Sequence, residues 1–139
     1  IGHPVAAAAG LAVVNALLDH DLIAQSRDKG AQLKNMLTQR FGQHPFIGDI
    51  RGKGMFLGLE IVEDRETKTP FDPALKLAAK FKKQAFKNGL ICYPMSGTRD
   101  GQIGDHILMA PPFIISDAEM TELVDKLDKT FEQTLPKHV

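Results

Sequence analysis

The sequence predicts an α+β domain: a small, largely antiparallel sheet with helices on one face, preceded by a long buried helix. From residue 22 onward the expected elements follow the order α-β-β-α-β-β-α. The strand segments alternate apolar and polar residues, whereas the other segments repeat their apolar residues with a helical period. Short strands combined with amphipathic helices give a two-layer domain, and 139 residues make one domain the default.

The first expected helix covers residues 5–18 and is apolar almost all round. Pro4 precedes it and suits a first-turn position, where its missing N–H would be unpaired anyway. A helix with apolar residues on several sides is buried, so we expect another domain or subunit to cover it. The chain opens at Ile1 without an initiator methionine, which indicates a piece of a longer protein.

A second helix is expected over residues 22–41, where Leu33, Leu37 and Phe41 share one stripe and Gly42 is placed as a C-cap. The segment GDIRGKGMFLGLEIV, residues 48–62, then predicts a strand pair. Its first strand is expected over residues 46–50 and its second over residues 55–62, because alternate residues are apolar. The expected turn between them is Arg51-Gly52-Lys53-Gly54.

The second half of the chain predicts two helices and two strands. A helix is expected over residues 74–87, and a short strand over residues 90–93 that ends at Pro94. Residues 95–105 are expected to form a long loop, and loops of that kind are often functional. A strand over residues 106–110 and the final helix follow. Ser116 and Glu119 form a capping-box pattern before the apolar stripe of that helix: Met120, Leu123, Val124, Leu127 and Phe131.

Composition narrows the function classes. The chain has 17 basic and 17 acidic residues, and this balance argues against a nucleic-acid or anionic-membrane partner. No segment reaches the roughly 18 apolar residues of a membrane span. The single cysteine, Cys92, excludes an intramolecular disulfide framework and favours a reducing, cytoplasmic compartment. We expect Cys92 to be a small buried hydrophobe in preference to a nucleophile.

Few residues carry an obvious chemistry. The histidines lack metal-ligand spacing, and we predict no metal site; they are His3, His20, His44, His106 and His138. Asp105-His106 is either a polar pair in a site or, as we prefer, a strand start whose ring is hydrogen-bonded locally. Arg51-Gly52-Lys53-Gly54 lacks the spacing of a phosphate loop, so we expect Arg51 to make a structural ion pair or to bind backbone carbonyls.

Two side chains near the expected loop are candidate substrate contacts. Arg99 has the planar fork that binds carboxylates, and on a flexible loop it could swing toward a substrate; the alternative is a solvated arginine. Tyr93 lies at the end of a strand and could offer a hydroxyl and a ring face to a ligand; the alternative is packing at the rim of the sheet. The residues alone lead to an α+β domain and not to a reaction.

Three segments together resemble a known family. They are GHP with its following alanines at residues 2–9, GDIRGKGM at residues 48–55, and LIC followed by APPFII at residues 90–92 and 110–115. In this order and spacing they resemble the C-terminal part of class III pyridoxal-phosphate-dependent aminotransferases, the omega-aminotransferase group. The resemblance covers nearly the whole chain.

The resemblance implies the C-terminal small domain of a fold-type I pyridoxal-phosphate enzyme, usually a homodimer, that moves an amino group between an amine or omega-amino acid and a keto acid. Residues 1–21 would be the connecting helix from the large domain, and residues 22–139 the small domain. The cofactor would form a Schiff base with a lysine upstream of this chain, so no lysine here is catalytic and the piece alone is expected to be inactive. Gly2 and His3 would lie near the cofactor phosphate.

The sequence departs from the family at both usual carboxylate anchors. Tyr93 stands where some members have a mobile arginine, and Met109 stands where ornithine-type members have one. We therefore hypothesise that Arg99 binds the carboxylate of the keto-acid acceptor. The alternative function is a non-catalytic α+β module for ligand binding or dimerisation.

Overall fold

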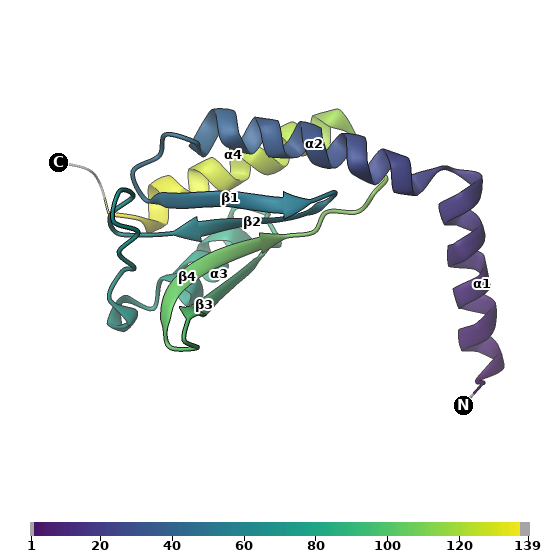
Figure 1. Ribbon diagram of the computed structural model, residues 1–139, viewed down its shortest axis with the longest axis horizontal. Coiled ribbons are helices and arrows are strands. Elements are labelled where there is room, and N and C mark those ends of the chain that lie inside the picture. The colour runs from purple at the N-terminus through teal and green to yellow at the C-terminus, as the bar shows by residue number, and fades with distance from the viewer. Residues whose placement is uncertain (1, 137–139) are drawn as a thin grey trace.

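The computed structural model describes residues 2–136 and consists of a four-stranded antiparallel sheet with helices on one face (Figure 1). Ile1 and His138 lie outside the described residues. The spatial strand order is β1-β2-β4-β3. The predicted class and element order are confirmed; the elements are α1 (Pro4–Asp19), α2 (Leu22–Phe41), β1 (Ile47–Lys53), β2 (Phe56–Ile61), a 3-10 turn (Pro73–Leu75), α3 (Leu77–Lys87), β3 (Tyr93–Arg99), β4 (Ile103–Met109) and α4 (Asp117–Thr134).

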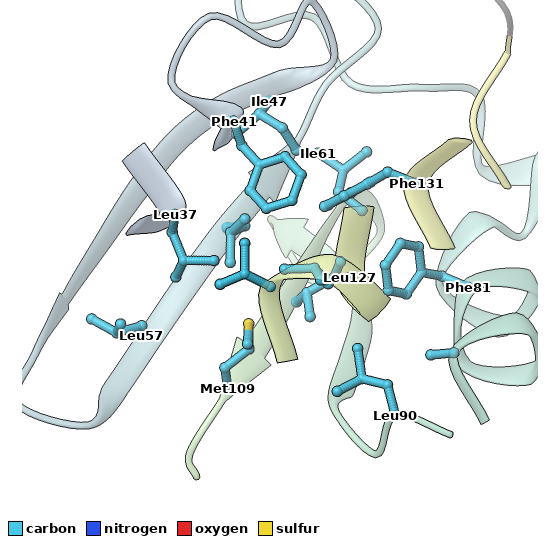
Figure 2. Close-up of a cluster of buried hydrophobic side chains, with 14 of the residues drawn as sticks. Leu37, Phe41, Ile47, Leu57, Ile61, Phe81, Leu90, Met109, Leu127 and Phe131 are labelled. Carbon is cyan, nitrogen blue, oxygen red and sulfur yellow. The ribbon is translucent and has the colours of Figure 1, made fainter. Parts of the chain in front are cut away.

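The core lies between the sheet and helices α2, α3 and α4. Leu59 in β2 pairs with Ile50 of β1 and Ile107 of β4, so one face of the sheet carries an apolar row toward the helices. Phe131 of α4 stands at the centre of this layer, with its ring 5.1 Å from that of Phe41 and 5.0 Å from that of Phe81 (Figure 2). These three rings join all three covering helices in one cluster.

Helices α2 and α4 agree with the sequence patterns. Helix α2 has the predicted bounds, and its stripe of Leu33, Leu37 and Phe41 is buried. The Ser116 hydroxyl accepts from the N–H of Glu119, and the Glu119 carboxylate accepts from the N–H of Ser116. The predicted capping box at the start of α4 is therefore confirmed.

The predicted turn between β1 and β2 is wrong by three residues. Strand β1 continues through Arg51 and Gly52 to Lys53, which pairs with Phe56, so the turn is Gly54-Met55. Gly52 has φ 144°, and a Cβ there would lie 2.1 Å from the carbonyl oxygen of Phe56. A glycine inside the strand thus lets the ladder continue where the sequence pattern indicated a bend.

The long loop expected over residues 95–105 is a β-hairpin, and the strand expected to end at Pro94 begins at Tyr93. Proline is tolerated because β3 is an edge strand, where one side of the backbone needs no ladder partner. Asp100 and Gly101, both with positive φ, lie in the turn. An Asp-Gly pair is a strong hairpin signal, and it was present in the sequence although a loop was expected there.

The helix expected from residue 74 begins at Leu77. The chain first makes the 3-10 turn, and Lys76 then takes a left-handed conformation with φ 50°, so no side chain caps α3 from the preceding residue. Asp105 of β4 caps the helix instead, because its carboxylate accepts a hydrogen bond from the backbone N–H of Ala78 in the first turn of α3. The segment between β2 and the 3-10 turn holds an isolated bridge between Asp64 and Thr69.

Helix α1 has the expected place but not the expected burial. None of its residues is buried by the part of the chain that the structure describes, and Val5 and Leu18 are 71% and 68% exposed. The helix stands away from the sheet at one end of α2 (Figure 1). Among residues 2–136 no single helix is long and apolar enough to cross a membrane. In the same range, only α1 and α2 taken together, with a 67° bend between them, have the length and composition of a membrane span.

Candidate functional site

The face of the sheet that helices α2 to α4 leave open carries the polar side chains. Cross-strand pairing places Asp49, Glu60, His106 and Met95 in one row across all four strands. The next row holds Arg51, Gly58, Leu108 and Tyr93.

Arg51 forms the centre of a charge cluster on this open face. Its Nε lies 2.6 Å from Asp49 Oδ2, and its Nη2 lies 3.6 Å from Glu60 Oε2. The predicted ion pair is therefore confirmed. Because the Arg51 side chain is 70% exposed, the pair contributes less than about 1 kcal/mol to stability. Arg51 thus contacts one carboxylate of its own strand and one of the neighbouring strand β2.

Asp105 and His106 do not form a joint site, because successive residues of a strand point to opposite faces. The ring of His106 shares a 2.8 Å hydrogen bond with the Thr98 hydroxyl across the hairpin, which agrees with the preferred prediction of a local bond. Asp105 is 5% exposed and lies on the helix side. Burial raises the pKa of its carboxyl, and the hydrogen bond from Ala78 opposes that rise.

Tyr93 is the first residue of β3 and pairs with Leu108, so it lies at the end of the sheet where β4 finishes at Met109. Its side chain is 59% exposed. The turn between β1 and β2 lies at this same end of the sheet, because Leu57 pairs with Met109. The structure thus brings together Tyr93, the end of β4 and the Gly54-Met55 turn.

Arg99 is the last residue of β3 and lies at the opposite end of the hairpin from Tyr93. Six residue steps along the strand separate their Cα atoms by about 20 Å, which is longer than one small substrate. Arg99 is also not on a flexible loop: its Nη2 donates to the Lys68 carbonyl oxygen at 2.8 Å. The structure therefore does not bring the two candidate substrate contacts together.

Gly2 and His3 lie at the start of α1, far from the open face of the sheet (Figure 1). Gly2 has φ 86° and open space around it. His3 is the N-cap, makes no side-chain cap, and is followed by no acidic residue in the first turn. Uncapped first-turn N–H groups and the positive end of the helix dipole are suited to an anion such as a phosphate.

Comparison with known proteins identifies the chain. Residues 1–131 match the aminotransferase class-III family. The chain belongs to this family. An uncharacterised aminotransferase of Schizosaccharomyces pombe is 42% identical over 133 residues, which are 96% of this chain and 29% of that protein.

Solved structures of transaminases are similar to this chain in fold and sequence. An (S)-enantioselective omega-transaminase from Thermomicrobium roseum has a TM-score of 0.85 at 33% identity, over 97% of this chain and 28% of that one. An amine transaminase from an uncultivated Pseudomonas species, in its pyridoxal-phosphate-bound form, has a TM-score of 0.81 at 30% identity, over 96% and 28%. The chain thus spans under a third of the length of these relatives, and the resemblance seen in its motifs is confirmed.

The segment of this class-III aminotransferase chain that meets Arg99 was not predicted from the sequence. Thr67 donates its backbone N–H to Asp64 Oδ1 at 2.7 Å, which forms a tight turn. Lys68 follows with φ 58° and donates its Nζ to the Gly48 carbonyl oxygen. The segment thereby links β1 to β3, the two edge strands. The Asp64-x-x-Thr67 spacing was the available signal, since aspartate side chains stabilise such turns.

Within residues 2–136 of this aminotransferase chain, no group of three or more His, Cys, Asp or Glu side chains could hold a metal ion.

Cys92 is half-buried next to the core, and burial raises the pKa of its thiol from 9.0 to about 11. A two-unit rise lowers the thiolate fraction near neutral pH about 100-fold, and the thiolate is the reactive species. Because a thiolate of higher pKa is also more nucleophilic, part of this loss is offset, and we expect iodoacetamide to alkylate Cys92 about tenfold more slowly in the folded chain than in the same chain in urea. Equal rates in the two states would mean that the partial burial of Cys92 does not suppress its thiolate.

Proposed function

We propose that the whole protein transfers an amino group from an amine or omega-amino acid to a keto acid with pyridoxal phosphate. In this proposal residues 1–21 are the connecting helix and residues 22–139 the C-terminal small domain. The observation that carries it is the family match over residues 1–131, with relatives of which this chain spans under a third. The exposed apolar helix α1 supports it, because a self-sufficient non-catalytic module would give that helix a polar face.

The residues of this chain fit one part of the cofactor, its phosphate. Gly2 leaves room for an anion, and the uncapped first turn after His3 offers N–H donors with no carboxylate nearby. When bound, pyridoxal phosphate supplies an electron sink for the substrate carbon. In our proposal Gly2 and His3 orient the cofactor through its phosphate. The lysine that bonds to the cofactor belongs to the preceding domain, so the 139-residue chain alone is inactive.

The other partners follow from the same proposal. The large domain and a second subunit cover the apolar surface of α1, of which the rest of residues 2–136 buries no residue. The single cysteine favours a reducing, cytoplasmic compartment.

The proposed function is tested by an assay of the full-length protein loaded with pyridoxal phosphate. With an aliphatic amine and pyruvate, we expect alanine to form at the rate at which the amine is consumed. The 139-residue chain, mixed with the same reagents, is the matched control and should form none. Full-length protein that retains the cofactor but transfers no amino group to any keto acid would refute the proposal.

Tyr93 and Arg99 lie too far apart to serve one small pocket, so paired variants decide between them. We propose Tyr93 as the substrate contact, because its side chain is exposed beside the end of β4, and keep Arg99 as the second candidate for the acceptor carboxylate. We expect Tyr93→Ala to raise the KM of the full-length enzyme about tenfold or more both for the amine and for pyruvate, as the loss of a positioned contact does. If Arg99 is instead the anchor, Arg99→Ala will raise the KM for pyruvate and Tyr93→Ala will leave it unchanged.

A further inference from the structure

The connection between β4 and α4, residues 110–116, begins directly after β4, at the end of the sheet that carries Tyr93. It contains Pro111 and Pro112, which have no N–H to donate. The Ile115 N–H donates to the Pro112 carbonyl oxygen within the connection, whereas the carbonyl groups of Phe113 and Ile115 receive donors from another element. Ile115 is 7% exposed and anchors the segment in the core, whereas Ile114 is 75% exposed.

Lys29 of α2 supplies those donors. Its Nζ donates to the carbonyl oxygen of Phe113 at 3.0 Å and to that of Ile115 at 2.7 Å, the second bond being part-buried. Hydrogen bonds from an ammonium group are shorter and stronger than neutral ones. One turn along α2, Gln32 Nε2 lies 3.3 Å from Asp117 Oδ1. Helix α2 is thus bonded to the β4–α4 connection through one ammonium group, that of Lys29, which donates to two carbonyl oxygens.

The part of α2 that carries Lys29 is itself fixed against the sheet. The next residue, Gly30, is buried and packs directly on the backbone of Gly54 in the β1–β2 turn; a Cβ at Gly30 would lie 2.2 Å from the Gly54 carbonyl oxygen. The connection that follows β4 and the β1–β2 turn are therefore both held to one helix segment. Leu108, the partner of Tyr93 in the ladder, lies two residues before the connection begins.

We propose that Lys29 is a positioning residue: by holding the carbonyls of Phe113 and Ile115 against α2, it sets the end of β4 and thereby the place of Tyr93. The inference rests on the proposed function, because it makes Tyr93 part of the substrate site. A purely stabilising lysine would affect unfolding and leave the KM unchanged. A positioning lysine changes the KM more than kcat, since a misplaced contact weakens binding at the site.

The test uses the full-length holoenzyme with three variants. Lys29→Met keeps the methylene stem and removes the donors, Lys29→Arg keeps donors, and Lys34→Met is the matched control on the exposed side of the same helix. We expect Lys29→Met to raise the KM for the amine roughly tenfold with less than a twofold fall in kcat. Lys29→Arg should recover most of the loss, and Lys34→Met should match the wild type. A KM within twofold of wild type in Lys29→Met would overturn the proposal.

A second readout is independent of activity. The amide of Ile115 donates to the Pro112 carbonyl oxygen at 3.0 Å, and its hydrogen exchange reports how firmly the connection is held. We expect faster exchange at Ile115 in Lys29→Met, with exchange at Leu59 in the sheet unchanged. Unchanged exchange at Ile115 would overturn the proposal even if the enzyme transfers no amino group. An inactive wild type with fast exchange in the variant would instead refute only the proposed function.

Discussion

Replacing Phe131 by alanine is expected to lower the free energy of unfolding of the 139-residue chain by about 3–5 kcal/mol, the range found for buried Phe-to-Ala changes. Phe131 is 1% exposed, and its ring contacts those of Phe41 and Phe81 from the two other covering helices. Removing it leaves a cavity where three helices meet, which neighbouring side chains fill only in part. Urea unfolding followed by circular dichroism measures the loss.

The control for Phe131→Ala is Phe86→Ala. Phe86 is on α3 and is 72% exposed, so its truncation should change the free energy of unfolding by less than about 0.5 kcal/mol. Similar losses for the two variants would mean that Phe131 is not the centre of the core.

Replacing Gly30 by alanine is expected to destabilise the chain by about 2 kcal/mol, although alanine favours helix. The added Cβ would meet the backbone of Gly54 at 2.2 Å. Backbone cannot turn aside as a side chain can, so α2 has to separate from the β1–β2 turn and lose its packing there. Urea unfolding again measures the effect.

Gly10→Ala is the matched control for Gly30→Ala. Gly10 lies inside helix α1, and no neighbouring segment of residues 2–136 comes within 4 Å of the position that a Cβ would take there. Alanine at this site should therefore cost no free energy of unfolding in the 139-residue chain. A Gly30→Ala variant as stable as wild type would contradict the close approach of α2 to the turn.

Local patterns predicted the elements whose stability is local. The stripe of Leu33, Leu37 and Phe41 placed α2 within its observed bounds, and the Ser116–Glu119 pair placed the start of α4. Both signals act within a few residues along the chain, so they need no knowledge of the tertiary fold.

Prediction failed where sheet pairing overrides local sequence. Pro94 was expected to end a strand, but it lies at the edge of the sheet, where a missing N–H costs little. Gly52 was expected in a turn, but its pairing with Leu57 continues the ladder. The position of a strand at the edge of a sheet and the length of its ladder depend on the whole fold, so a short sequence pattern cannot predict them.

The candidate site was harder to predict than the fold. Sequence patterns indicated Tyr93 and Arg99 as neighbours of one loop, and the hairpin places them at opposite ends of a strand. The sequence patterns gave no indication that Lys29 bonds to the connection before α4, because the two carbonyl groups that it binds lie 84 and 86 residues away along the chain. Contacts of that range depend on how α2 crosses the end of the sheet.

We propose that this chain completes an enzyme that carries amino groups on pyridoxal phosphate. The most direct measurement is the visible spectrum of the full-length protein during the two half-reactions. We predict that an amine donor removes the absorbance of the bound cofactor and that pyruvate, added after the free amine is removed, restores it with release of alanine. A spectrum that the amine does not change, or that pyruvate does not restore, would contradict the claim.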